Sequence, residues 1–265
     1  AKGIVNIDDG YGSKMLDKCS TTTVTYAIDQ SADYQAVDIE YFKDKTKFKL
    51  LYKNKSYDVE TSLVAKFNIY NLLAVIAALS ESGIEISEVI SSLSSINQVD
   101  GRVEKIDLGQ PFTIIIDYAH TPDSFDKILS YASEIKGDKR IITVFGSAGE
   151  RDILKRKMLG EVANKYCDMI ILTEDDPRKE DVREICEEIA QGIDKNYIII
   201  ENRYDAIYQA VELANSEDVI LILGKGNDQY MARYNGKEFY PGDGEVAKKA
   251  IREYLKGFEE EEYYE

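Results

Sequence analysis

The sequence contains very little of several residue types on which common functional sites depend. Its 265 residues include one histidine, His120, and three widely spaced cysteines, Cys19, Cys167 and Cys186. A single imidazole excludes zinc sites built from several histidines and any proton relay that needs two imidazoles. The cysteines form no Cys-x-x-Cys pair, so we expect free, buried thiols in a cytoplasmic protein.

Positive charge and long apolar runs are also scarce. Lysine and arginine total 33 against 49 aspartate and glutamate residues, which gives a formal net charge of −16. A protein that binds nucleic acid through its phosphates needs a basic face, so we expect no nucleic-acid partner. The same charge disfavours an anionic membrane surface, and no segment approaches the roughly 18 apolar residues of a membrane span. We therefore expect no membrane insertion.

The sequence pattern changes near residues 96–101, which indicates two parts. Before this point, short runs that alternate apolar and polar residues predict half-buried antiparallel strands over Ile4–Ile7, Thr22–Ile28, Ala36–Glu40, Phe48–Tyr52 and Ser56–Glu60. A deeply buried helix is predicted over Lys66–Ser82, and a second over Ser87–Leu93 with Ser87 as its N-cap. Residues 97–101 are predicted to form a linker.

After residue 110 the chain alternates strands with helices, which predicts a doubly wound α/β domain with a mostly parallel sheet. Apolar runs of about five residues suit strands buried on both faces; they cover Thr113–Asp117, Arg140–Phe145, Asp168–Leu172, Tyr197–Ile200 and Val219–Leu223. Helices are predicted over Asp123–Ile135, Ile153–Tyr166, Val182–Gly192, Ala206–Ala214 and Glu245–Leu255. A hairpin is predicted over Met231–Tyr240, with Asn235 and Gly236 at its middle.

Polar clusters follow four of these strands, at residues 117–123, 146–152, 173–178 and 224–228. Ligands of doubly wound sheets collect outside the carboxyl ends of the strands, so these clusters are candidate site loops. Each loop also has a plainer interpretation. Residues 146–149 form either a tight turn before a helix capped by Asp152 or an anion site at that helix N-terminus. No GxxxxGK[ST] pattern occurs, so this loop is not a P-loop.

The other three clusters leave similar alternatives open. Asp175 and Asp176 form either an ordinary turn or an acidic pair for an ammonium group, with Arg178 free to bind a carboxylate. His120 is either a structural residue at a helix start or a site residue, and Lys225 is either a solvated loop charge or a site cation. It is less expected that all four clusters lack a function than that any one of them does.

Taken together, these motifs resemble those of the Mur ligases, the ATP-dependent amide-bond-forming enzymes of peptidoglycan synthesis. The most similar branch adds the third amino acid to UDP-N-acetylmuramoyl-L-alanyl-D-glutamate. The resemblance rests on motifs that occur in the family's order across essentially the whole chain, at residues 6–12, 67–71, 101–104, 117–123, 146–152 with Lys155 and Arg156, 175–178 and 224–226. Folylpolyglutamate ligases and cyanophycin synthetase look less similar in these loops.

The resemblance implies a domain organisation. Mur ligases have a UDP-sugar domain, a central ATPase domain and a C-terminal Rossmann-like domain. We expect residues 1–98 to be the end of the central domain, residues 99–257 to be the complete C-terminal domain, and residues 258–265 to be an acidic tail. The P-loop, the Mg²⁺ ligands and a carbamylated lysine are expected upstream. The chain is therefore expected to be a fragment that is inactive alone and can self-associate, whereas the full-length enzyme is expected to be a monomer.

The resemblance also implies a reaction and a nucleotide site. With ATP and Mg²⁺, the intact enzyme phosphorylates a substrate carboxylate, and an incoming amine attacks the acyl-phosphate. Asn68 matches the asparagine that contacts adenine, and Arg102 and Asp117 match residues near the nucleotide, Asp117 being suited to ribose hydroxyls. His120 is expected to face the phosphates or to hold its loop. The C-terminal domain is expected to close as a lid.

The amino-acid site implied by the resemblance uses Arg151, Asp175, Asp176, Arg178, Gly224, Asn227 and Asp228. Diaminopimelate-adding relatives typically read Asp-Asn-Pro-Arg in one loop and His-Glu after Gly-Lys-Gly in the other. Here Asp176 replaces the Asn, and Asn227 and Asp228 replace His-Glu. The extra negative charge favours L-lysine over meso-diaminopimelate as the dibasic substrate, although the retained Arg178 points the other way.

A different class of function stays open. The chain could be a non-catalytic module that binds an amino acid or a nucleotide, or a subunit whose ATPase half is another polypeptide. A GxxxxGK[ST] loop upstream in the same reading frame would favour the ligase. A nicotinamide oxidoreductase is disfavoured because no GxGxxG follows a strand.

Overall fold

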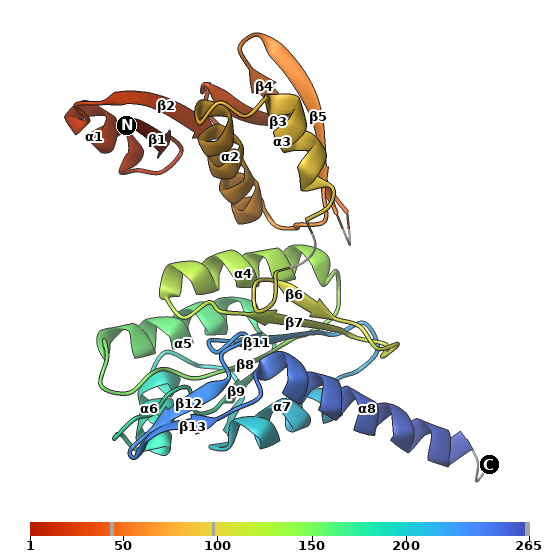
Figure 1. Ribbon diagram of the computed structural model, residues 1–265. Helices are drawn as coiled ribbons and strands as arrows, with labels where there is room; N and C mark the ends of the chain where they lie inside the picture. The colour runs from red at the N-terminus through yellow and green to blue at the C-terminus, as the bar shows by residue number, and fades with distance from the viewer. Residues whose placement is uncertain (43–44, 97–98, 263–265) are drawn as a thin grey trace. The chain divides into compact units, whose positions relative to one another are not determined.

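The structure is a computed structural model that describes residues 1–42, 45–96 and 99–262. The chain divides into two compact units, Ala1–Gln98 and Val99–Glu265 (Figure 1). Among the residues described, no helix combines the length and apolar character needed to cross a bilayer.

The first unit contains a five-stranded sheet with the strand order β1-β2-β3-β4-β5. The strands are β1 (Lys2–Asn6), β2 (Thr22–Ala27), β3 (Tyr34–Tyr41), β4 (Thr46–Tyr52) and β5 (Lys55–Thr61). All five were predicted, but the expected antiparallel pairing is wrong for the first three, because β1–β2 and β2–β3 pair in parallel. Only β3–β4 and β4–β5 are antiparallel. Alternating residues report a half-buried face and carry no information on strand direction.

Three helices accompany this sheet: α1 (Gly12–Lys18), which the sequence pattern did not predict, α2 (Lys66–Glu81) and α3 (Ile86–Leu93). Helix α2 packs Ile69, Leu73 and Ile76 into the core with sheet residues such as Leu50. The expectation that the whole apolar stretch of α2 is buried is wrong, since Val75 is 46% exposed. Helix α3 has Glu85 rather than Ser87 as its N-cap, without a side-chain capping bond.

The second unit confirms the predicted doubly wound sheet. Its six strands have the order β10-β9-β8-β11-β7-β6, with β6 (Glu104–Ile106), β7 (Thr113–Asp117), β8 (Ile141–Phe145), β9 (Met169–Leu172), β10 (Tyr197–Ile199) and β11 (Val219–Leu223). Every pairing is parallel except that of β6, an unpredicted edge strand antiparallel to β7. Strands β8 and β11 are buried at every position, as strands covered on both faces should be.

Helices cover both faces of this sheet (Figure 1). They are α4 (Pro122–Ile135), α5 (Leu154–Tyr166), α6 (Val182–Ala190), α7 (Arg203–Glu212) and α8 (Asp243–Glu262). Helices α7 and α8 pack on one face, where Ile207 and Ile251 join the sheet residues Ile116 and Ile222 in one core. Helix α4 begins with a capping box between Thr121 and Ser124, which fixes the loop that follows β7.

Three further expectations can be compared with the structure. The predicted hairpin is confirmed as β12 (Tyr230–Arg233) and β13 (Gly236–Phe239). Cys167 and Cys186 are buried as expected, but Cys19 is exposed, so the expectation of three buried thiols is wrong for it. Residues 97–98 of the predicted linker and 263–265 of the predicted tail lie outside the described residues, and α8 continues to Glu262.

Candidate functional site

Four polar loops of the second unit lie along one edge of its sheet. Strands β9, β8, β11 and β7 are consecutive neighbours in the sheet and are parallel, so their carboxyl ends point the same way. The loops that follow them contain the predicted clusters 173–178, 146–152, 224–228 and 117–123. The topology therefore brings together loops that are far apart in the sequence, as expected at such an edge.

We call the edge formed by these four loops the rim. Asp175 and Gly224 lie close together on it. Gly224 has φ +111°, and a Cβ atom there would lie 2.4 Å from Asp175 Oδ2, so this position requires glycine. Asp175 is 8% exposed, and no described residue donates a hydrogen bond to its carboxylate. Burial raises the pKa of Asp175, against the opposing charges of Arg203 and Lys225. The rim thus holds one buried carboxylate without a donor.

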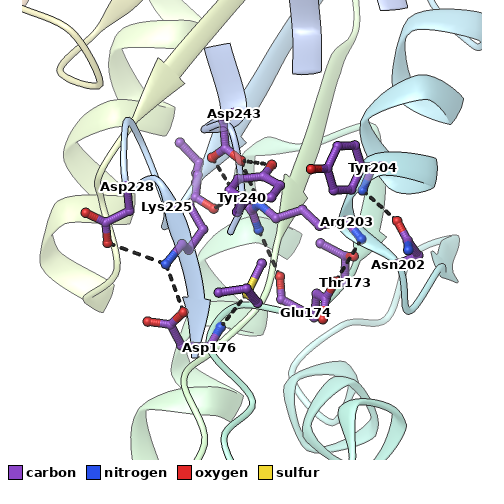
Figure 2. A network of polar contacts seen from close by, with 12 residues as sticks. Thr173, Glu174, Asp176, Asn202, Arg203, Tyr204, Lys225, Asp228, Tyr240 and Asp243 are labelled. Atoms are coloured by element: carbon purple, nitrogen blue, oxygen red, sulfur yellow. Dashed lines mark hydrogen bonds and ion pairs between the residues drawn. The ribbon is translucent and has the colours of Figure 1, made fainter. Parts of the chain in front are cut away.

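Asp176 and Asp228 are instead joined through Lys225, as Figure 2 shows. The Lys225 ammonium lies 2.8 Å from Asp176 Oδ1 and 3.4 Å from Asp228 Oδ2. The Lys225 side chain is 1% exposed, and its ammonium lies 4.4 Å from the centre of the Tyr230 ring. Burial opposes the charged form, but the hydrogen bond to Asp176 and its charge outweigh burial and raise the pKa of Lys225. We call these three residues the Lys225 triad.

Arg178 follows on the same loop as Asp176, and both residues have left-handed backbones, with φ of +53° and +48°. The Arg178 guanidinium donates to the Gly149 carbonyl, while the Gly149 N–H donates to the Asp176 carbonyl at 3.0 Å. These bonds join the loop after β9 to the loop after β8. Within the described part of the chain, Arg178 has no carboxylate partner, so its guanidinium can still bind one.

Arg203 and Asp243 form a fully buried ion pair that the sequence reasoning missed. The Tyr240 hydroxyl donates to Asp243 at 2.7 Å (Figure 2). Arg203 also donates to the carbonyls of Glu174 and Leu223. One signal was available: Arg203 lies three, four and seven residues before the buried Ala206, Ile207 and Ala210, so it shares their buried helix face. The pair anchors the ends of β9 and β11, from which the site loops begin.

Asp117 and His120, at the end of β7 and in the loop after it, lie near Tyr118, as does Arg102, which precedes β6. Asp117 accepts backbone N–H groups of Val103 and Ala119, both at 2.8 Å. Burial raises the pKa of Asp117 although these two donors lower it. The Arg102 guanidinium lies 4.7 Å from the Tyr118 ring centre, and the His120 ring is exposed with its centre 5.2 Å from that of Tyr118. Exposed cationic and aromatic groups beside a carboxylate can contact a nucleotide.

The remaining predicted residues are less closely tied to this rim. Asn227 follows the Lys225 loop and is exposed, and Arg151 is exposed without an ion-pair partner among the residues described. Asn68 belongs to the first unit, where its amide donates to the Val64 carbonyl at 2.7 Å and accepts from Asn71 at 3.2 Å. Each half of that amide therefore already has one partner.

The rim does not fit a divalent metal ion. Mg²⁺ needs several oxygen ligands in near-octahedral geometry, but the Lys225 ammonium already binds Asp176 and Asp228. Throughout the part of the chain that the structure describes, no group of three or more histidine, cysteine, aspartate or glutamate residues could hold a metal ion.

Comparisons with known proteins agree with the fold. Residues 1–79 match the model of the Mur ligase middle domain, and residues 101–226 match that of the Mur ligase glutamate ligase domain. The UDP-N-acetylmuramoyl-L-alanyl-D-glutamate–2,6-diaminopimelate ligase of Syntrophomonas wolfei is 39% identical over 254 residues, covering 94% of this chain and 51% of the relative. The UDP-N-acetylmuramyl-tripeptide synthetase of Borreliella burgdorferi is 37% identical over 256 residues, covering 94% and 50%. The chain thus spans about half the length of the curated relatives it matches.

Solved structures extend the comparison. A UDP-N-acetylmuramoyl-L-alanyl-D-glutamate–2,6-diaminopimelate ligase has a TM-score of 0.62 at 28% identity, covering 96% of this chain and 53% of that one. The MurF ligase of Thermotoga maritima in complex with ADP has a TM-score of 0.70 at 16% identity, covering 97% and 54%, and shows the fold alone. The two units and their order are those of Mur ligase middle and C-terminal domains. The chain belongs to the Mur ligase family.

Proposed function

We propose that this chain supplies the amino-acid-binding part of a cytoplasmic, ATP-dependent ligase that adds a dibasic amino acid to UDP-N-acetylmuramoyl-L-alanyl-D-glutamate. One observation carries the proposal: a single loop presents both Arg178, which has no carboxylate partner in the described residues, and Asp175, whose carboxylate has no donor there. Such a loop can bind a carboxylate and an ammonium group together. The names of the diaminopimelate-adding relatives support the same substrate class.

The chemistry explains why such a site is needed. ATP supplies the phosphoryl group that activates the substrate carboxylate as an acyl-phosphate. The incoming amine then forms the new C–N bond, the bond to the phosphate oxygen breaks, inorganic phosphate leaves and the amine loses a proton. Arg178 and Asp175 would hold the amino acid so that its amine meets the acyl carbon, since positioning supplies much of the rate in such a reaction. Arg102, Asp117 and His120 would contact the nucleotide. Asn68 belongs to the first unit and stays a separate candidate for contacting adenine.

L-Lysine is the amino acid that the charge of the rim favours. Asp175 and the two carboxylates of the Lys225 triad outnumber the two cations of these loops, Lys225 and Arg178, so the rim attracts a further cation. meso-Diaminopimelate is the second candidate, because Arg178 is available for the second carboxylate that lysine lacks and because several relatives carry that name.

The 265-residue sequence contains no GxxxxGK[ST] pattern. We propose that these 265 residues bind the amino acid but do not turn over ATP without a P-loop-bearing segment. This proposal also separates the ligase from a purely binding module, because only the ligase gains turnover when that segment is supplied.

The test has two stages. Calorimetry of the 265-residue chain should show binding of L-lysine or meso-diaminopimelate and none of L-norleucine, which lacks the distal ammonium group. ADP release should then be measured with the dipeptide substrate for the chain alone and for a polypeptide in which the upstream half of the Syntrophomonas wolfei relative precedes residue 1. Turnover by the joined polypeptide alone is the expected result. Equal binding of all three amino acids would contradict the proposal, and near-normal turnover by the chain alone would contradict its inactivity.

Asp176→Asn tests the choice between the two amino acids. Removal of one negative charge should raise the lysine KM of the joined polypeptide and shift its preference toward meso-diaminopimelate. If neither the lysine KM nor the preference changes, the assignment to lysine is wrong.

A further inference from the structure

The Lys225 side chain extends into the rim from a backbone that is hydrogen-bonded on both sides. Gly224 and Gly226 flank it with φ of +111° and +51°, backbone conformations that residues other than glycine rarely adopt. The Gly224 N–H donates to the Asp117 carbonyl at 3.1 Å, and the Gly226 carbonyl accepts the Asp243 N–H at 3.1 Å. Both neighbours are therefore tied to other segments, which fixes the backbone from which the Lys225 side chain extends.

Asp176 is the carboxylate of the triad that is held by further bonds. Asp176 Oδ1 accepts the Ala232 N–H at 2.8 Å as well as the Lys225 ammonium, and the Asp176 N–H donates to Met231 Sδ at 3.2 Å. Figure 2 shows Asp176 and Asp228 converging on the lysine ammonium. A buried ammonium with two carboxylates stays charged and uses both of them.

The three carboxylates of the rim therefore differ in availability. Asp176 and Asp228 share a cation that belongs to the chain itself, whereas Asp175 lies against Gly224 with no hydrogen-bond donor among the described residues. An ammonium group arriving at the rim meets one available carboxylate rather than three. With Lys225 these three carboxylates carry a net charge of −2, and without it they would carry −3.

We propose that Lys225 is a specificity-determining positioning residue, which pairs with Asp176 and Asp228 and leaves Asp175 to receive the ammonium group of the incoming amino acid. This inference rests on the proposed function. Lys225 acts through the two carboxylates and touches no substrate. It tunes how strongly the rim prefers a purely cationic tip, as in lysine, over the zwitterionic tip of diaminopimelate.

Charge variants of the 265-residue chain test the inference by calorimetry with L-lysine and meso-diaminopimelate. Lys225→Met should shift the ratio of the two dissociation constants about tenfold toward lysine, because it frees two carboxylates. Lys225→Arg should keep the wild-type ratio, and the double variant Lys225→Met with Asp176→Asn should return it to within about threefold. If Lys225→Met weakens the binding of both amino acids equally, Lys225 is only structural and the inference is wrong.

Lys237→Met is a matched control. The Lys237 ammonium lies 3.6 Å from the centre of the same Tyr230 ring that Lys225 approaches, but Lys237 is exposed and has no ion pair with a described residue. Its removal takes a cation from that ring without freeing a carboxylate of the triad. The ratio of dissociation constants should stay at the wild-type value, and a shift as large as that of Lys225→Met would overturn the inference.

A measurement on the wild-type chain keeps the inference testable if Lys225→Met fails to fold. The buried ammonium should give a slowly exchanging lysine ¹⁵N–¹H signal that is missing in Lys225→Arg, moves in Asp176→Asn and persists in saturating L-lysine. Loss of the signal on adding lysine would show that substrate displaces Lys225, which overturns the inference. If no amino acid binds while the signal still responds to Asp176→Asn, the proposed function has failed and the triad has not.

Discussion

The guanidinium of Arg203 donates to both carboxylate oxygens of Asp243, from Nε at 2.7 Å and from Nη2 at 2.8 Å, and both side chains are fully buried. The same guanidinium reaches the carbonyls of Glu174 and Leu223, at 3.1 and 2.8 Å. Helices α7 and α8 are thereby joined to the ends of β9 and β11, where the amino-acid loops begin. The pair is structural, and the geometry of the rim depends on it.

Arg203→Met should destabilise the second unit strongly. It leaves the Asp243 carboxylate buried without its cation, and breaking a buried pair on one side costs about 3–5 kcal/mol. Urea denaturation followed by tyrosine fluorescence measures the change in unfolding free energy. Lys248→Met, which breaks the exposed pair of Lys248 with Glu245, should cost about 1 kcal/mol or less. A loss below about 1 kcal/mol for Arg203→Met would contradict the role assigned to the pair.

Periodicity in the sequence predicted most of the second unit because its strands are short, apolar and regularly separated by helices. Strand β6 was not predicted because Ile106 is its only apolar residue, so no apolar run marks it. In the first unit the same reasoning predicted five strands but gave the wrong direction for two pairings, because a strand's residues do not encode the direction of its neighbour. Helix α1 begins at a turn-like Gly-rich segment and has no side-chain cap, so no local signal marked its start.

The candidate site was predictable as a set of loops but not as a set of contacts. Sheet topology brings Asp176, Arg178 and Lys225 to one edge, and that much follows from strand order. The ion pair between Asp176 and Lys225 depends on the left-handed backbone of Asp176 and on the Ala232 N–H, which belongs to the distant hairpin. Asp175 and Asp176 were expected to bind a ligand ammonium as a pair. In the structure Asp176 is already bound to Lys225, and Asp175 alone has no hydrogen-bond donor among the described residues.

Gly224→Ala should damage the amino-acid site more than the fold. A Cβ atom at this position would lie 2.4 Å from Asp175 Oδ2 and would also require a strained φ of +111°. The Asp175 carboxylate must then move, so amino-acid affinity should fall at least tenfold, while stability falls by about 1–3 kcal/mol. Calorimetry and urea denaturation measure the two effects. Gly257→Ala, within α8, is the control, since no heavy atom lies within 4 Å of its added Cβ. Amino-acid affinity should stay close to wild type and stability should not fall, because alanine stabilises a helix by about 0.5–1 kcal/mol relative to glycine.

Asp218 should make stability depend on acidic pH. Its side chain is 3% exposed and accepts from Arg140 Nη2 at 2.5 Å and from the Asn215 N–H at 2.8 Å. Burial raises the pKa of Asp218, but the hydrogen bonds from Arg140 and the backbone outweigh burial and lower it. A carboxyl group whose folded pKa lies below its unfolded value of about 3.9 stabilises the fold fully above that value. The stabilisation is lost as pH falls through the folded pKa.

Asp218→Asn should therefore cost about 1–3 kcal/mol at pH 7 and progressively less below about pH 4. Unfolding free energies from pH 3 to pH 7 for both proteins give the difference directly. Asp123→Asn, at the exposed pair with Lys127, should change stability by about 1 kcal/mol or less at pH 7. A difference between wild type and Asp218→Asn that stays constant down to pH 3 would show that the carboxylate charge does not contribute.

Arg178→Lys should separate the two candidate amino acids. Lysine keeps the charge but loses the planar fork that binds a carboxylate through two parallel hydrogen bonds. If Arg178 binds the second carboxylate of meso-diaminopimelate, the affinity for that amino acid should fall at least tenfold, since charge-assisted bonds contribute about 1.5–3 kcal/mol, while L-lysine affinity changes less than about threefold. Arg183 lies on α6 and forms an exposed pair with Glu201. Arg183→Lys should change the affinity for neither amino acid. Equal losses of affinity for both amino acids would indicate that Arg178 binds a carboxylate that the two share. The melting temperature of the variant would show whether losing the contact with the Gly149 carbonyl also destabilises the fold.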